Sequence, residues 1–418
     1  MIPLRRHISH AFRTQFIMKL IEPIVAWQEE IAHVRRDLHA HPELSYQEFR
    51  TADIVAAKLQ EWGIPIDRGL GGTGVVGVIE GKLPQDPAKP RAVGLRADMD
   101  ALPMQELNAF EHRSQHDGKM HACGHDGHTA MLLGAAQYLA RHRDFAGTVY
   151  LIFQPAEEGG AGAQRMIDDG LFTKFPMEAV FGMHNWPGFK VGQFGVTAGP
   201  IMASANEFSI VVKGKGAHGG MPHLGHDPIM AAAQMAVSMQ TIVSRNRHPI
   251  EAAVLSITQI HAGSADNVIP ADAQLRGTVR TFTTEMTDLI ERRMREIAEH
   301  TAAAMNCQVD FVFDRNYPPT INDPQETAFC AEVMRGIVGK DNVDDHVTPT
   351  MGAEDFSYML LQKPGCYVWI GNGDGDHRAQ GHGMGPCMLH NGSYDFNDAL
   401  LPLGATYWVQ LALQRLAR

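Results

Sequence analysis

Apolar positions along the chain follow two spacings, and each spacing predicts one type of element. Residues 27–40 place Ile31, Val34 and Leu38 at helical spacing, which predicts an amphipathic helix, and a second helix is expected over 50–62. Strands are expected in the apolar runs 74–80, 92–97, 148–153 and 179–183, with a helix at 128–141. Strands that alternate with helices predict an α/β domain with a mostly parallel central sheet and helices on both faces.

The pattern changes over residues 204–315. Here the expected order is strand 206–213, helix 227–245, strands 251–261 and 272–282, helix 284–304 and strand 308–314. This βαββαβ order predicts a ferredoxin-like domain. We therefore expect one α/β domain over 21–203 and 316–418, interrupted by an inserted domain over 204–315.

The first 20 residues, MIPLRRHISHAFRTQFIMKL, are basic and contain no acidic residue. They lack the unbroken apolar run of a secretory signal. We expect a disordered extension over 1–20. Two alternatives stay open: an upstream start with Met18 as a second candidate start, and an organelle-targeting peptide.

Composition narrows the function classes. The 418 residues are 44% hydrophobic and 20% charged, which is typical of a folded globular protein. The 36 Lys and Arg against 47 Asp and Glu give a net charge of −11 without a basic cluster, so we expect no nucleic-acid partner. The sequence contains no run of 18 apolar residues, so we expect no membrane-spanning helix. The five cysteines are widely spaced without a CxxC, which favours a reducing cytoplasm.

Polar side chains of catalytic type follow three of the predicted strands. Asp98 and Asp100 come after the second strand, Glu157 and Glu158 after the third, and His184 after the fourth. Ligands of open α/β sheets bind outside the carboxyl ends of the strands. The sequence therefore predicts that separate segments deliver these acids and imidazoles to one edge of the sheet.

The densest cluster of candidate metal ligands is HACGHDGH, residues 121–128. Cys123 and His125 are two residues apart, and His121 and His128 flank them. Thiolate and imidazole are good ligands for borderline divalent metals, and a pair in a loop before a helix can point at one ion. The alternative is a loop of helix-capping polar residues. Four His and Cys in eight residues favour the metal site.

The other candidate positions are weaker when taken alone. In PAEEGGAG, residues 155–162, one carboxylate can ligate a metal while its neighbour acts as general base; the alternative is a solvated acidic turn. The place of His184 at the sheet edge favours a role as metal ligand, whereas the spacing around His390 alone neither favours nor excludes one. In the inserted domain, His218 could lean over a site and Arg280 could pair with a carboxylate, but each is more often structural.

Together these motifs resemble the M20 metallopeptidase family, most closely its amidohydrolase branch of hippurate hydrolases, indole-acetyl-amino-acid hydrolases and N-acetyl-diaminopimelate deacetylases. The matching segments are RRDLHAHPELSYQE, RADMDALP, MHACGHDGHTAMLLGAA, FQPAEEGGAGA, GMHNWP, GAHGGMPH, NVIP, GTVRTF, MGAEDFS and LHNGSYDFND. They are specific for the family and not for the substrate. The resemblance implies a catalytic domain carrying two divalent ions, with Mn, Zn, Co and Ni all open. It also implies a lid domain through which the chain forms a homodimer or a tetramer.

The resemblance also implies roles for individual residues. The implied metal ligands are Cys123, His125, Glu158, His184 and His390. Glu157 is implied as general base and Asp100 as an acid that orients a ligand imidazole. Asp98 stands where other branches have a metal-binding histidine, a role that His125 is expected to take.

The implied substrate contacts come from the lid and one loop. His218 matches a lid histidine that reaches the substrate from the neighbouring subunit, Asn267 and Arg280 match residues that hold the substrate's carboxylate, and Gly352 matches a backbone contact.

The implied activity is metal-dependent hydrolysis of the amide bond of N-acyl amino acids such as hippurate. It would release a carboxylic acid and a free amino acid. N-acetyl-diaminopimelate deacetylation and other M20 aminoacylase or peptidase activities are alternatives. So is a non-catalytic metal-retaining binding protein, against which the presence of both Glu157 and His218 argues.

Overall fold

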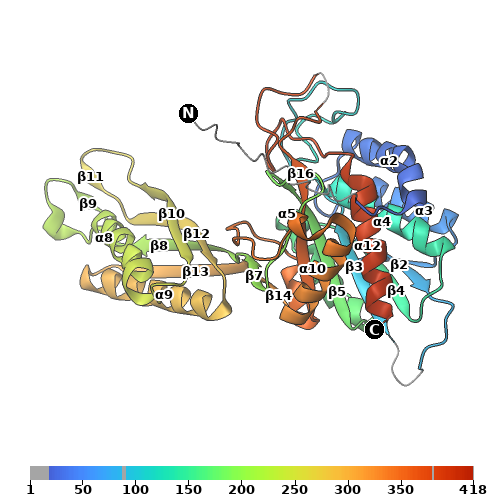
Figure 1. Ribbon diagram of the computed structural model, residues 1–418. Coiled ribbons are helices and arrows are strands. Elements are labelled where there is room, and N and C mark those ends of the chain that lie inside the picture. Colours follow the sequence, from blue (N-terminus) through green and yellow to red (C-terminus); the bar gives the residue numbers. More distant parts are fainter. Residues whose placement is uncertain (1–17, 87–90, 379–380, 418) are drawn as a thin grey trace, which may run out of the picture.

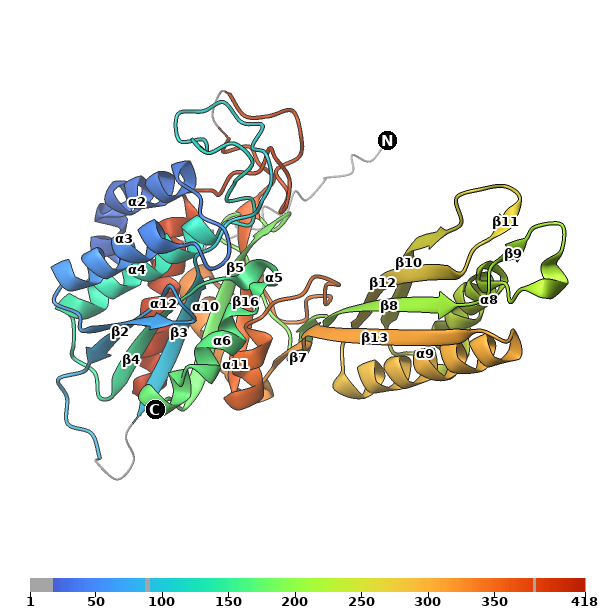
Figure 2. The same ribbon diagram turned by 180° about the vertical axis from the view of Figure 1, so that it is seen from behind.

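The computed structural model describes residues 18–86, 91–378 and 381–417. Figures 1 and 2 show a larger lobe built around one sheet and a smaller lobe beside it. Of the extension predicted over 1–20, residues 1–17 lie outside the described part. The backbone amide of Lys19 donates to the carbonyl of Ile337 at 2.9 Å.

The larger lobe contains an eight-stranded sheet in the order β1-β2-β4-β3-β5-β16-β6-β15. Its strands are β1 (Ile66–Leu70), β2 (Gly74–Glu80), β3 (Ala92–Asp98), β4 (Thr148–Gln154), β5 (Ala179–Pro187), β6 (Phe194–Gly195), β15 (Val343–Asp344) and β16 (Gly365–Gly373). The central strands β4, β3, β5 and β16 are parallel, whereas β1 and β2 add antiparallel strands at one edge. All seven residues of β3 are buried, as expected for a parallel strand covered on both faces.

Helices cover both faces of this sheet. One face packs against α1 (Glu22–Ala26), α2 (Gln28–Ala40), α3 (Phe49–Glu61), α4 (His125–Arg141), α10 (Pro324–Val338) and α12 (Leu400–Leu416). The other packs against α6 (Gly162–Asp168), α7 (Leu171–Lys174) and α11 (Ser357–Gln362). The predicted α/β class is confirmed. Strands β1, β6, β15 and β16 of this sheet had no matching prediction.

The smaller lobe, called the lid below, has an antiparallel sheet in the order β10-β12-β8-β13. Its elements are β8 (Ala205–Lys213), α8 (Pro228–Thr241), a π-helical turn (Ile242–Asn246), β10 (Ala253–Ala262), β12 (Asp272–Thr281), α9 (Thr284–Ala304) and β13 (Gln308–Tyr317). The order is the predicted βαββαβ. The domain boundaries at 204 and 315 stay a prediction, and β13 extends two residues past the second of them.

Helix α9 shows how the sequence specifies the lid. The Thr283 hydroxyl caps it by accepting the amide of Met286. From Met286, an apolar stripe at four-residue spacing faces the sheet: Met286, Ile290, Met294, Ala298 and Ala302.

Short elements complete the fold. They are α5 (Glu157–Gly160), β7 (Gly199–Met202), β9 (Ala217–His218), a 3₁₀ turn (Pro222–Leu224), β11 (Val268–Ile269), β14 (Thr320–Asn322) and a 3₁₀ turn (Lys340–Asn342). Strands β7 and β14 pair beside the two chain crossings into the lid. In the part of the chain that the structure describes, no helix combines the length and the apolar character needed to cross a membrane.

Candidate metal and catalytic site

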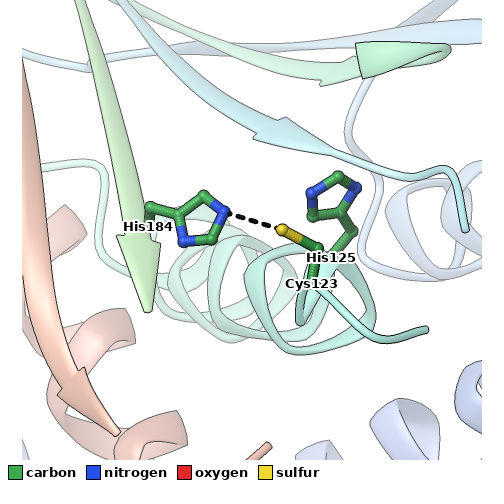
Figure 3. A group of neighbouring side chains, drawn as sticks. All are labelled: Cys123, His125 and His184. Carbon is green, nitrogen blue, oxygen red and sulfur yellow. Dashed lines mark hydrogen bonds between the residues drawn. The ribbon is translucent and has the colours of Figure 1, made fainter. Parts of the chain in front are cut away.

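The predicted site residues of the catalytic domain gather at the carboxyl ends of the central strands. Asp98 ends β3, Glu157 and Glu158 follow β4, and His184 lies near the end of β5. Figure 3 shows His184 on its strand, facing Cys123 and His125 at the start of helix α4.

A glycine lets the loop before α4 approach the sheet closely. Gly124 has φ +91°, and a Cβ there would lie 2.3 Å from Asn185 Nδ2 and 2.5 Å from Tyr394 Oη. Only glycine combines this backbone conformation with this contact. The loop thereby places Cys123 Sγ 3.3 Å from His184 Nε2 (Figure 3).

The environment of His184 leaves one ring nitrogen for a ligand role. Its Nδ1 lies 2.6 Å from the carbonyl oxygen of Asn185. A carbonyl can only accept, so Nδ1 carries the proton and donates. The lone pair of Nε2 then points at the Cys123 side, which is the usual arrangement of a metal-bound histidine.

Glu158 lies between two imidazoles. Its Oε1 is 3.2 Å from His390 Nε2 and 3.9 Å from His125 Nε2. The other ring nitrogen of His125, Nδ1, lies 3.4 Å from Asp100 Oδ1. Asp100 therefore stands where it can orient the His125 ring.

Asp100 also fixes the backbone of both glutamates. Its carboxylate accepts the amides of Glu157 at 3.0 Å and Glu158 at 2.9 Å, and the hydroxyl of Ser45 at 2.8 Å. Ala156, just before them, adopts a left-handed conformation with φ 54°. This turn needs outside support because alanine disfavours that conformation.

Glu157 is buried in an acidic environment. Burial raises the pKa of its carboxyl well above the usual range, and the nearby carboxylates of Glu354 and Glu158 raise it further. Its Oε1 accepts the backbone amide of Asp355 at 3.4 Å. A carboxylate with a raised pKa is a stronger base, so this group is suited to accept a proton.

The donor atoms fit a divalent metal. Cys123, His125 and His184 form one group of donor atoms within 4.8 Å of one another, and Cys123, Glu158 and His390 form a second that shares the thiol. Both ring nitrogens of His125 and Oε1 of Glu158 are buried without a hydrogen-bond partner among the described residues. Burial and the adjacent glutamates raise the pKa of the Cys123 thiol. A bound cation would satisfy these atoms and favour the thiolate.

Asp98 and His128 bond to each other beside the candidate ligands. Asp98 pairs with Arg96 Nη1 at 2.7 Å and with His128 Nδ1 at 2.6 Å. His128 Nε2 accepts the backbone amide of Asn185 at 3.0 Å. Both ring nitrogens of His128 are therefore engaged, and Asp98 is held by a buried arginine.

His121 stands apart from these contacts. It is buried, and neither of its ring nitrogens has a hydrogen-bond partner among the described residues. Burial lowers its pKa to about 4.

Several residues that shape the site had no predicted role. Glu48 accepts the amide of Ala156 at 2.9 Å, and the Tyr317 hydroxyl donates to the carbonyl of Glu157. Glu354 and Asp355 contact Arg96 and surround Glu157. The segments HPELSYQE and MGAEDFS contain three of these residues and were the signal that could have pointed to them. Tyr317 lies in no such motif.

The predicted lid residues divide between two places. His218 on β9 is directly paired with Val268 on β11, and the amide of Gly219 donates to the carbonyl of Asn267 at 2.7 Å. Figures 1 and 2 show β9 and β11 at the end of the lid far from the large sheet. Arg280 lies near the other end of β12. Within one chain, His218 is therefore not brought to the candidate metal ligands.

Gly352 lies in the loop between β15 and α11, on the side of the catalytic domain. Its amide donates to Thr350 Oγ1 at 3.3 Å, and a Cβ there would lie 3.3 Å from Met202 Cε.

Comparison with known proteins agrees with this geometry. Residues 94–414 match the model of peptidase family M20/M25/M40. The hippurate hydrolase of Campylobacter jejuni is 41% identical over 399 residues, which cover 96% of this chain and all of that protein. The N-acetyl-L-cysteine deacetylase of Bacillus subtilis is 41% identical over 84% of this chain and 82% of its own length.

A solved structure of similar fold agrees as well. The Bacillus subtilis protein described as a dinuclear metal binding peptidase from the M20 family superimposes with a TM-score of 0.79 at 35% identity, covering 94% of this chain and 99% of that one. The predicted family and enzyme class are confirmed: the chain belongs to peptidase family M20/M25/M40 and is an amidohydrolase of that family.

Proposed function

We propose that this amidohydrolase cleaves the amide bond of N-acyl amino acids, with hippurate-like compounds as the substrate class and Glu157 as general base. The observation that carries the proposal is the position of the Glu157 carboxyl. It is buried beside the candidate ligands His125 and Glu158, and two carboxylate contacts fix its backbone and that of Glu158.

Cys123, His125, Glu158, His184 and His390 would hold two divalent ions. When bound, such ions polarise an amide carbonyl and lower the pKa of water. Thiolate and imidazole ligands favour Mn, Co, Ni or Zn over Mg and Ca.

Glu157 performs the proton transfers in this mechanism. Its carboxylate takes a proton from the attacking water and then gives it to the nitrogen of the leaving amino acid. The raised pKa of Glu157 supports both steps, since a base that is too weak would not hold the proton between them.

Arg280 is proposed to bind the free carboxylate of the substrate. Its Nη1 donates to the carbonyls of Val279 at 3.2 Å and Asn206 at 3.5 Å. No described carboxylate forms an ion pair with this half-buried guanidinium. A carboxylate is the group that it would hold best, in a bidentate pair. Asn267 and the backbone at Gly352 are proposed to assist from the lid tip and from the catalytic domain.

The position of His218 supports a homodimer. Because β9 lies at the far end of the lid, we propose that His218 serves the site of a second subunit, where it stabilises the oxyanion of the tetrahedral intermediate. Exposed apolar side chains on the lid support an interface there: Met230 is 59%, Val237 69% and Ile260 55% exposed. Ile260 belongs to β10, which is an edge strand of the lid sheet in the described part of the chain.

A substrate panel tests this proposal. Chelated protein is reloaded separately with Mn, Co, Ni or Zn and assayed for amine release from hippurate, N-acetyl-methionine, indole-acetyl-alanine and N-acetyl-diaminopimelate. Metal-dependent release from at least one compound is expected. Protein with bound metal that releases no amine from any of them would contradict the proposed substrate class and favour a metal-retaining binding protein.

A further inference from the structure

The turn that carries the two glutamates, residues 155–162, is held by side chains from three parts of the chain. Glu48 accepts the amide of Ala156, and Tyr46 donates to the carbonyl of Gly160 at 2.5 Å. Asp100 accepts the amides of Glu157 and Glu158. These three residues belong to the catalytic domain.

A further support comes from the lid. Tyr317 is the last residue of β13, the lid strand that leads back into the catalytic domain. Its hydroxyl donates to the carbonyl of Glu157 at 2.5 Å and accepts the amide of Ala161 at 3.2 Å. The residue is only 6% exposed. It is therefore a buried link between the end of the lid and the residue proposed as the base.

A β-bulge directs the side chain of Tyr317 toward the turn of residues 155–162. The pairing of β13 with β8 shifts between Arg315 and Tyr317, so that Arg315 lies opposite Asn206 and Tyr317 opposite Ala205. A bulge redirects the side chain that follows it and often occurs beside an active site. Arg315 is exposed, and Tyr317 turns into the protein.

A second tyrosine, Tyr358, lies beside Tyr317 and offers a matched comparison. Tyr358 on α11 donates its hydroxyl to the carbonyl of Asn316, and its ring centroid lies 6.2 Å from that of Tyr317. Tyr358 is thus also a tyrosine and lies beside Tyr317, but among the described residues it forms no hydrogen bond to residues 155–162.

We propose that Tyr317 is a positioning residue for the reaction, through which the last strand of the lid fixes the backbone of Glu157. This inference rests on the proposed function, because it needs Glu157 to be the base. The supports from Glu48 and Asp100 remain when the hydroxyl is removed. The turn should therefore stay folded and keep Glu158 in place, while the direction of the Glu157 carboxyl becomes less defined.

The test uses full-length, metal-loaded Tyr317→Phe, with Tyr358→Phe as the matched control. Tyr317→Phe should lower kcat about tenfold, with KM, metal content and unfolding midpoint close to those of the unmodified protein. Tyr358→Phe should keep kcat within about twofold. Equal effects of the two substitutions, or no effect of Tyr317→Phe, would overturn the inference.

A double-mutant cycle separates positioning from a general loss of structure. Glu157→Asp should lower kcat on its own, and Tyr317→Phe added to it should cost less than about twofold, because the carboxyl is already displaced. The same tenfold loss in both backgrounds would show that Tyr317 acts independently of Glu157 and would overturn the inference. An unchanged kcat in Glu157→Asp would instead contradict the role of Glu157 as base, so the two failures are distinguishable.

Discussion

Asp100 offers a quantitative test of how the site is organised. Its two carboxylate oxygens accept two backbone amides and a hydroxyl, and Oδ1 faces His125 Nδ1 at 3.4 Å. Asp100→Asn preserves the shape but replaces one oxygen by an NH₂ group. In either orientation of the new amide, at least one backbone N–H of the turn faces a donor and loses its acceptor.

The cost follows from these contacts. A hydrogen bond to a charged acceptor contributes roughly 1.5–3 kcal/mol. Because 1.4 kcal/mol is about a factor of ten, the loss of one such bond predicts metal binding weaker by about 10-fold to 100-fold, the range typical of residues that orient metal ligands. Turnover should fall with it, since the same bonds position Glu157.

The assay is a metal titration against a competing chelator, together with initial rates of amine release. Asp37→Asn is the control: this partly exposed carboxylate pairs with Arg50 at 2.9 Å on the surface, and its loss should change metal affinity less than about twofold. An Asp100→Asn protein that binds metal as tightly as the unmodified protein and keeps its kcat would contradict this role of Asp100.

Three further outcomes are expected. Cys123→Ala should lose metal, measured as bound ion per chain, and full occupancy would remove Cys123 from the ligand set. Mixing inactive Glu157→Gln with inactive His218→Ala subunits should restore up to about a quarter of the activity, because half of random dimers are heterodimers with one complete site; no restoration would place His218 in its own subunit's site. Burial lowers the pKa of His39, but the buried carboxylates of Asp126 and Glu106 have the larger opposite effect, and together these raise the pKa to about 10. Its contribution to stability is complete below pH 6.5 and is lost as the pH rises through 10, with a loss on the order of 2 kcal/mol between pH 7 and 9. Denaturant unfolding should show that the free energy of unfolding falls from pH 7 to pH 9, and that it falls less in His39→Gln. An equal fall in both proteins would contradict the raised pKa of His39.

Elements with strong periodicity were predictable from the sequence. The helix over 284–304 and the strand over 74–80 occur with the predicted bounds, since an apolar stripe and a run of β-branched residues specify them locally. Residues that directly follow strands were also predictable as neighbours, because parallel strands bring their carboxyl ends to one edge. Glu157 and His184 are examples.

Contacts that depend on the inserted domain were not predictable in this way. The link from Tyr317 to Glu157 joins residues 160 positions apart and depends on a one-residue bulge, which no spacing indicates. Asp98 shows a second limit. Asp98 and Asp100 follow the same predicted strand, so their positions in the sequence do not distinguish their roles. Only the packing shows that Asp98 pairs with Arg96 and His128.

Metal content and turnover of Glu157→Gln, measured on the same sample, decide whether Glu157 is the general base. The amide keeps the shape of the side chain but cannot accept the proton of water. Removal of a general base typically costs about 10²–10⁴-fold in rate. The metal content should equal that of the unmodified protein, and the rate of amine release should fall by at least about 100-fold. A metal-loaded Glu157→Gln protein with unreduced turnover would contradict the role of Glu157 as general base.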